Sequence, residues 1–266
     1  MNTPNHNTTD PTQQPEGTVF ESFDDWAQLL RQSGNGEPLT EHHAPQNTIT
    51  NSTAANAATH PDAPAFRPTL RQPMALLKIV DDGHEDGETV RIRGDTFVIG
   101  RTEGDLVIPH DISMSARHAQ IERLSAGGWQ LADLGSARGT YVRVTGARLK
   151  SGLQFQIGST RLRFESTDPE SAWLVEVLGH GEGRRHECLP TTATTLGRIG
   201  GGCHVMIDDP FASPVHAELR HTDHGWKIVN RGLNGLWIMI EAPVRMTATS
   251  QFQCGEQRFV FVPLVE

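Results

Sequence analysis

The feature that most constrains the fold of this chain is a set of short motif elements that occurs twice, in the same order. The pairs are Gly100-Arg101 and Gly197-Arg198, Ser115-x-x-His118-Ala and Ser213-x-x-His216-Ala, Gly128-Trp129 and Gly225-Trp226, and Gly139 and Gly235. The members of each pair are 96 to 98 residues apart, so the copies differ in length only by short loop changes. A solenoid unit is much shorter, and the repeat therefore indicates duplication of a whole domain.

From Met74 onward, short runs of alternating apolar and polar residues are separated by turn residues, as in ALLKIV, TFVIG and TYVRV. Many short strands at close spacing are typical of an all-β sandwich. A polar break at residues 166–171 precedes the restart of the pattern in AWLVEVLG. We therefore predict an all-β fold with two consecutive sandwiches, in domains at 73–167 and 168–266.

Residues 1–72 differ in composition: they are rich in Asn, Thr, Pro, Gln and Ala and contain 8 acidic against 3 basic residues. Such a segment buries too little apolar surface to offset the entropy of ordering, so we predict a largely disordered N-terminal tail. One short amphipathic helix is predicted at 18–32, where Val19, Phe23, Trp26 and Leu30 share one helical face. This helix either docks on the chain's own domains or folds in the groove of a partner.

Composition and missing motifs disfavour several classes of function. Neither repeat is basic, and no Lys/Arg stripe with interleaved aromatic residues occurs, which argues against nucleic acid as a partner. No apolar run is long enough for a bilayer and no signal-peptide pattern is present, so we expect a cytoplasmic protein without a membrane partner. Cys188, Cys203 and Cys254 are odd in number and far apart, as expected of reduced thiols. Without a nucleophile elbow, a phosphate-binding loop motif or a zinc-ligand spacing, we predict no enzymatic activity, no metal and no cofactor.

The motif residues themselves carry a family resemblance. Ile99-Gly-Arg101, Ser115-x-x-His118-Ala and the stretch from Trp129 to Thr140 resemble a forkhead-associated (FHA) domain. The second copy, with Leu196-Gly-Arg198, Ser213-x-x-His216-Ala and Asn230-x-Gly-x-Asn234-Gly235, is a more diverged match. The resemblance implies two FHA-type sandwiches whose loops at one end bind phosphothreonine in an extended peptide.

The resemblance also gives each motif residue a role. The residues that match the family's phosphate-binding Arg and Ser are Arg101, Arg198, Ser115 and Ser213. A guanidinium fork and a hydroxyl donor suit a doubly charged phosphate with strong acceptor oxygens. The residues that match structural supports of the binding loops are His118, His216, Gly139 and Gly235.

The two copies differ at a fourth position of the site. Asn234 matches the family's Asn that holds the ligand backbone, because its amide both donates and accepts hydrogen bonds. The first copy has Arg138 there, which only donates and adds a positive charge that could serve as a second phosphate contact. We therefore predict that the second domain is the main phosphothreonine-binding site.

The predicted function is that of a non-catalytic signalling adaptor that binds phosphothreonine-bearing proteins downstream of a Ser/Thr kinase. Thr8, Thr9 and Thr18 make the tail itself a candidate ligand, since tethering raises the effective concentration. The alternative is a phosphate-independent interaction scaffold with degenerate FHA sites. Arg138 favours this alternative, as do Ala116 and Pro214, which follow the site serines where binding members often have a polar residue.

Overall fold

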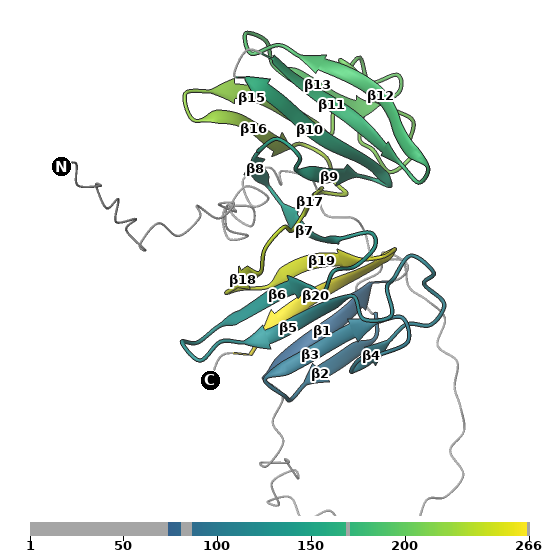
Figure 1. Ribbon diagram of the computed structural model, residues 1–266, viewed down its shortest axis with the longest axis vertical. Coiled ribbons are helices and arrows are strands. Elements are labelled where there is room, and N and C mark those ends of the chain that lie inside the picture. The colour runs from purple at the N-terminus through teal and green to yellow at the C-terminus, as the bar shows by residue number, and fades with distance from the viewer. Residues whose placement is uncertain (1–73, 81–86, 169–170, 265–266) are drawn as a thin grey trace, which may run out of the picture.

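The computed structural model describes residues 74–80, 87–168 and 171–264, and within them it contains twenty β-strands and no helix (Figure 1). The strands are β1 Ala75–Val80, β2 Thr89–Ile92, β3 Thr96–Gly100, β4 Leu106–Val107, β5 Ala119–Arg123, β6 Trp129–Asp133, β7 Thr140–Val144, β8 Gly146–Arg148, β9 Gln154–Ile157, β10 Thr160–Asp168, β11 Ser171–Leu178, β12 Gly181–Cys188, β13 Thr194–Arg198, β14 Val205–Ile207, β15 Ala217–Thr222, β16 Gly225–Asn230, β17 Leu236–Met239, β18 Val244–Met246, β19 Ser250–Cys254 and β20 Gln257–Pro263. The all-β prediction is confirmed. The tail and the helix predicted at 18–32 lie outside the described residues.

Alternating sequence patterns place one face of each strand in a core. In β1, Ala75, Leu77 and Ile79 are buried, whereas the residues between them are half-buried. In β10, Leu162 and Phe164 are buried in the same alternating manner. A shift of one residue in pairing would move the apolar set to the other face, so this alternation specifies the register.

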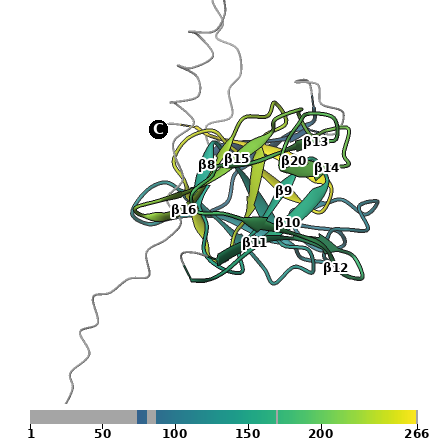
Figure 2. The same ribbon diagram turned by 90° about the horizontal axis from the view of Figure 1, so that it is seen from above.

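The strands form one ten-stranded sheet, in the order β12-β11-β10-β9-β17-β7-β19-β20-β1-β2, and two five-stranded sheets. One five-stranded sheet has the order β18-β6-β5-β3-β4 and the other β14-β13-β15-β16-β8. Each covers one half of the ten-stranded sheet, which makes two sandwiches that lie end to end along the long axis (Figure 1). Seen along that axis, one sandwich lies behind the other (Figure 2).

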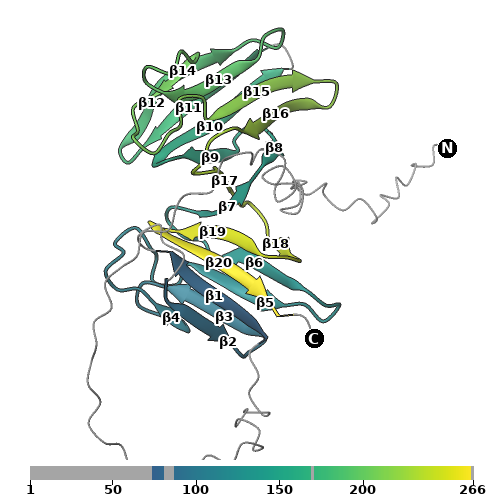
Figure 3. The same ribbon diagram turned by 180° about the vertical axis from the view of Figure 1, so that it is seen from behind.

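Each sandwich contains strands from both sequence repeats. The first sandwich combines β1 to β7 with the C-terminal strands β18, β19 and β20, which pair with β6, β7 and β1. The second sandwich combines β11 to β17 with β8, β9 and β10, which pair with β16, β17 and β11. Figures 1 and 3 show the exchange: yellow β18 to β20 lie among the blue and teal strands, and teal β8 to β10 among the green ones. Each of the ranges 73–167 and 168–266 thus contributes strands to both sandwiches.

The chain crosses between the sandwiches at two connections, β7–β8 and β17–β18. A single residue, Thr145, separates β7 from β8, which is too short for a turn that would bring the chain back to its own sandwich. Its carbonyl instead accepts a hydrogen bond from the backbone N–H of Asn230, at 2.8 Å, in the other repeat. At the centre, β7 and β17 pair antiparallel with Val142 opposite Ile238, which joins the two halves of the ten-stranded sheet.

Both cores are closed by aromatic contacts between repeats. In the first sandwich, Trp129 packs edge-on against Phe261, with ring centroids 5.6 Å apart. In the second, Trp226 packs against Phe164 at 5.9 Å. Both tryptophans are only 4% exposed and therefore belong to the cores. Each core therefore contains an aromatic pair formed by one residue from each repeat.

Three further observations describe the same part of the chain. Cys188, Cys203 and Cys254 are buried and unpaired, and burial raises the pKa of the Cys188 thiol to about 11. None of the residues in the described ranges forms a helix of sufficient length and apolar character to cross a membrane. Among the same residues, no group of three or more His, Cys, Asp and Glu side chains is placed to hold a metal ion.

Candidate functional site

In the first copy, three loops converge on Ser115. Arg101 directly follows β3, Ser115 lies between β4 and β5, and Arg138 lies between β6 and β7. The Ser115 carbonyl accepts a hydrogen bond from the Arg101 backbone N–H at 2.9 Å. The Ser115 Oγ accepts one from the Ala137 backbone N–H at 3.0 Å. The loops that carry the residues predicted to bind phosphate are therefore neighbours in space.

The second copy has the equivalent hydrogen bonds around Ser213. Its carbonyl accepts from the Arg198 N–H at 2.9 Å, and its Oγ accepts from the Leu233 N–H at 3.2 Å. A serine hydroxyl that accepts a hydrogen bond keeps its own hydrogen for donation. Among the residues that the structure describes, neither serine hydroxyl has an acceptor, so both are free to donate to an incoming anion.

A buried histidine connects the loops of the first copy. Nδ1 of His118 accepts a hydrogen bond from the Ser115 backbone N–H at 3.1 Å, and Nε2 lies 3.2 Å from the Gly139 carbonyl oxygen. Because Nδ1 accepts, the proton of the neutral ring is on Nε2, which donates to Gly139. Gly139 has a φ of 76°, a left-handed conformation that suits glycine.

His216 has the same position in the second copy. Its Nδ1 accepts from the Ser213 N–H at 3.0 Å, and its Nε2 donates to the Gly235 carbonyl at 3.0 Å. Burial is the largest influence on both histidines, and it lowers the pKa of each imidazole below the usual value of 6.5. Both rings are fully buried, so they hold the loops and cannot reach a ligand.

The arginine side chains differ from the histidines in having free donors. Arg198 is exposed and Arg101 is half-buried. Within the described ranges, neither guanidinium makes a hydrogen bond or an ion pair, and the Nε of Arg101 is buried without a partner. A planar group with five donors and a free serine hydroxyl, on segments joined by a backbone hydrogen bond, are suited to a phosphate.

The fourth position separates the two copies in the structure as well. Asn234 is exposed at the loop tip, where its Nδ2 donates to the Phe211 carbonyl at 2.8 Å. Its backbone carbonyl accepts from Trp237 Nε1 at 3.0 Å, which fixes the loop to β17. Arg138 is exposed too, and its charge acts on the buried Tyr141, whose pKa is raised mainly by burial. The second copy thus has a neutral amide where the first has a cation.

Two aspartates that sequence reasoning missed hold the serine loops in place across the repeats. Oδ2 of Asp209 accepts from the Ser159 backbone N–H and from its Oγ, both at 2.6 Å, and Oδ1 accepts from the Phe211 N–H at 2.7 Å. In the first copy, Asp111 accepts from the Glu256 backbone N–H at 2.8 Å. In both copies the aspartate belongs to one repeat and the turn to the other. Each aspartate lies four residues before the site serine, and this repeated spacing is the signal that would have revealed them.

The β6–β7 loop of the first copy is held by a different carboxylate. Asp133 Oδ1 accepts from the Ser136 Oγ at 2.6 Å and from the Thr140 Oγ1 at 2.7 Å. Together these hydrogen bonds outweigh the effect of burial and lower the pKa of the Asp133 carboxyl. The second copy has Asn230 at this position. Its Nδ2 donates to the Gly232 carbonyl, and its Oδ1 accepts from the Gly232 N–H. Both loops are therefore fixed in shape without a ligand.

Comparison with known proteins defines the family. The FHA domain model matches residues 97–158 and 194–255. A 115-residue stretch is 30% identical to the oxoglutarate dehydrogenase inhibitor of Corynebacterium jeikeium and covers 42% of this chain and 78% of that protein. The chain belongs to the FHA domain family and contains two copies of the domain.

Particular relatives and structures show the range of this likeness. The glycogen accumulation regulator GarA of Mycolicibacterium smegmatis is 37% identical over 100 residues, which cover 36% of this chain and 62% of GarA, so the match leaves out more than a third of that protein. The FHA domain of CT664 from Chlamydia trachomatis matches with a TM-score of 0.34 and 14% identity, over 72% of this chain and 98% of that one.

Proposed function

We propose that this chain is a non-catalytic adaptor that binds phosphothreonine-containing segments of partner proteins, mainly through its second FHA site. The observation that carries the proposal is the group formed by Arg198, Ser213 and Asn234. The first two offer donors that have no acceptor in the described residues, and the third offers an exposed amide beside them. The Ser213 hydroxyl is held by the Leu233 N–H before the ligand arrives, so this donor binds without a large ordering cost.

The phosphate is the part of the ligand that this group favours. A phosphorylated threonine has a charge near −2 and three acceptor oxygens, whereas plain threonine has neither. Each charge-assisted hydrogen bond stabilises the complex by about 1.5 to 3 kcal/mol, and desolvation and peptide ordering offset part of this, so we expect micromolar affinity. Two relatives that are named as a regulator and as an inhibitor support a regulatory role rather than a catalytic one.

The test is fluorescence polarisation with a degenerate phosphothreonine peptide library and its unphosphorylated counterpart. Arg198→Ala removes the main phosphate contact, and we expect affinity to fall by about tenfold or more, from the energy of one charge-assisted bond. Arg101→Ala is the matched variant at the first site and should have the smaller effect. Equal binding of phosphorylated and plain peptides, with no effect of Arg198→Ala, would contradict the proposal.

A phosphate-independent scaffold is the second candidate, and a specific observation favours it. Phe211 is 61% exposed and Leu233 is 89% exposed, and both lie in loops of the second site. Exposed apolar residues at a rim are typical of protein-binding surfaces. If this function is the right one, a Phe211→Ser, Leu233→Ser double variant should lose its partners in a pull-down, and phosphatase treatment should leave wild-type capture unchanged.

The tail remains a proposed ligand of the same site. Thr8, Thr9 and Thr18 lie outside the described residues, so the proposal rests on their sequence context and on tethering. Phosphorylation by a Ser/Thr kinase should reduce the affinity of the full chain for a separate phosphothreonine peptide, and replacing all three threonines by alanine should restore it. An unchanged affinity after phosphorylation at these residues would exclude the tail as a ligand.

A further inference from the structure

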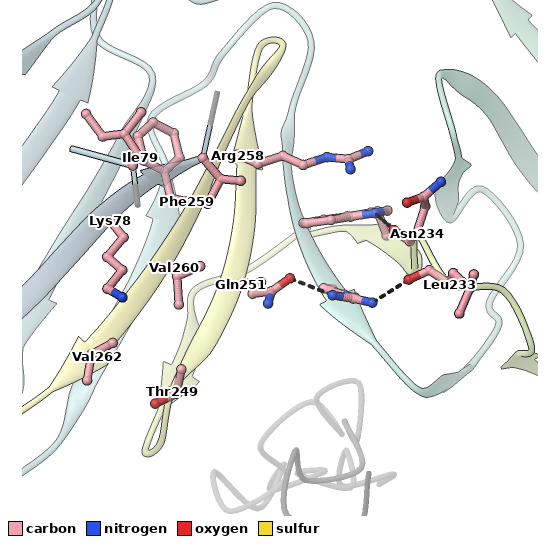
Figure 4. A pocket seen from close by; sticks show the side chains of 14 residues that line it. Lys78, Ile79, Leu233, Asn234, Thr249, Gln251, Arg258, Phe259, Val260 and Val262 are labelled. Carbon is pink, nitrogen blue, oxygen red and sulfur yellow. Dashed lines mark hydrogen bonds between the residues drawn. The ribbon is translucent and has the colours of Figure 1, made fainter. Parts of the chain in front are cut away.

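A cavity of about 490 Å³ lies beside the second site, between the two sandwiches (Figure 4). One wall is the outer face of β1, β19 and β20 in the first sandwich, with Lys78, Gln251 and Arg258. The opposite wall is the β16–β17 loop of the second sandwich, with Leu233 and Asn234. Strand exchange thus places strands of the first sandwich next to the fourth position of the second site.

The described lining of this cavity carries three cationic side chains. Its charged residues are Lys78, Arg143 and Arg258, and within the described residues it includes no Asp or Glu. Arg143 connects the two walls, since its Nη1 donates to Gln251 Oε1 and its Nη2 to the Leu233 carbonyl, both at 2.8 Å. Figure 4 shows these two bonds as dashed lines. The guanidinium is therefore held in one position at the border of the two sandwiches.

Arg258 is held in a similar way from the other side. Its guanidinium carbon lies 4.8 Å from the centroid of the Trp237 ring, and its Nε donates to Gln253 Oε1 at 3.4 Å. Burial lowers the pKa of Arg143 and of Arg258; for Arg258 the positive charge of Arg143 acts in the same direction and the negative charge of Asp209 acts against both. Two cations that repel each other in a partly desolvated place are stabilised by an anion between or beside them.

The first site lacks this combination of charges. Repeat spacing places Val175, which is fully buried, where the second site has Lys78, and Met239 where it has Arg143. Met239 instead packs close to Gly139, where its Sδ would lie 2.6 Å from an added Cβ. The first site keeps Arg161 at the position of Arg258, so the combination of three cations is specific to the second site, next to Asn234.

We propose that this cavity is an additional anion subsite of the second FHA site, which binds a carboxylate or a second phosphate on the stretch of phosphopeptide that passes Asn234. The assignment rests on the proposed function, because the peptide reaches the cavity only when its phosphothreonine is held by Arg198 and Ser213. The subsite requires both repeats, since its cations come from β1, β7 and β20 and its rim from the β16–β17 loop. It therefore selects partners with an acidic or doubly phosphorylated motif.

The experiment uses the full chain and three sets of phosphothreonine peptides with the same library background. One set has neutral flanks, one has a single Glu scanned through the five positions on each side, and one has a second phosphothreonine scanned likewise. We expect one position where Glu or phosphate raises affinity by about fivefold or more, and Lys78→Gln should remove most of that gain while leaving the neutral peptides unchanged. A gain with phosphate but not with Glu assigns the subsite to a second phosphate, and gains with both assign it to either anion.

Two further variants keep the outcome unambiguous. Lys78→Glu should reverse the preference, so that Lys at the same peptide position binds better than Glu, and Lys227→Gln in β16 is the matched lysine control with no expected effect. If all peptides bind equally and lose affinity with Arg198→Ala, the subsite is refuted and the phosphothreonine site stands. If no phosphopeptide binds better than its plain counterpart, the proposed function itself fails.

Discussion

Asp209→Asn tests most clearly whether the loop from Asp209 to Ser213 is held in place by the other repeat or is stable without it. The carboxylate is 3% exposed and accepts three hydrogen bonds, two from Ser159 and one from Phe211. The amide keeps the size of the side chain, loses the charge and directs N–H groups toward donors. A bond to a charged acceptor is stronger than a neutral one by about 1 kcal/mol, so the three bonds together predict a loss of about 3 kcal/mol.

Urea unfolding at pH 7 measures this loss directly. For a folded unit of this size, each kcal/mol lowers Tm by about 2 to 4 °C, which predicts a Tm lower by about 6 to 12 °C. The same change should weaken phosphothreonine binding, because the loop from Asp209 to Ser213 positions the site hydroxyl. Asp208→Asn is the matched control, since Asp208 is the exposed neighbour.

The pH dependence of the stability difference between wild type and Asp209→Asn tests the same prediction in a second way. Burial acts to raise the pKa of the Asp209 carboxyl, but hydrogen bonds, first from Ser159, lower it below the ordinary value of 3.8. A carboxyl whose pKa is lower in the folded than in the unfolded state stabilises the fold at pH values above its unfolded-state pKa. This stabilisation is lost as the pH falls through the folded-state pKa. The difference between wild type and Asp209→Asn should therefore shrink below about pH 4. Surface substitutions change the free energy of unfolding by up to about 0.5 kcal/mol. If the unfolding free energy of Asp209→Asn lies within that range of the value for Asp208→Asn, the reasoning is refuted. A stability difference from wild type that does not depend on pH would also refute it.

Three other substitutions or conditions test the site. Arg138→Asn, made in the Arg198→Ala background, should raise phosphothreonine peptide affinity at the first site by about fivefold, the value of one neutral hydrogen bond, as measured by polarisation. Stability should fall as pH drops below about 6.5, because the pKa values of His118 and His216 are lowered in the folded state and the unfolded chain takes up the protons; urea midpoints at pH 7.5 and 5.5 measure this. Gly158→Ala should destabilise the chain by about 1 to 3 kcal/mol in thermal unfolding, because Gly158 has a φ of 62° and an added Cβ would lie 2.5 Å from Asp209 Oδ2.

Each of these has a clear contrary result. Unchanged affinity with Arg138→Asn would mean that the fourth position does not limit the first site. A urea midpoint that is flat between pH 7.5 and 5.5 would mean that neither histidine is held neutral. For the glycine, Gly152→Ala is the control, because Gly152 has a φ of 95° but open space around its Cα. Equal losses for the two glycine variants would assign the effect to backbone strain and not to the contact with Asp209.

Much of the fold was predictable from local patterns. Alternation in runs such as β1 and β10 specifies which face is buried, and it holds whichever strand lies alongside. The same holds for the Arg, Ser and His positions, since their loops are short and their partners are mostly nearby in the chain. Asp111 and Asp209 were also within reach, because each precedes its serine by the same four residues.

The strand exchange was not predictable in this way. Equivalent strands of the two repeats present similar apolar faces, so Trp129 could pack against an aromatic residue of either repeat with similar energy. The chain crosses at Thr145 and at residues 240–243, and local alternation does not specify which sandwich the following strands join. Arg143 acquires its place between the sandwiches only through that exchange, and nothing in its sequence context indicates it.

The central claim, that the second site is completed by the first repeat, is tested most directly by a double-mutant cycle between Ser159 and the two loop aspartates. Ser159→Ala removes a hydroxyl that donates to Asp209 in the exchanged fold, whereas a repeat closed on itself would direct it toward Asp111. Urea unfolding of the single and double variants measures the coupling free energy. The exchanged fold predicts about 1 kcal/mol of coupling between Ser159→Ala and Asp209→Asn and none with Asp111→Asn. Coupling with Asp111 in place of Asp209 would contradict it.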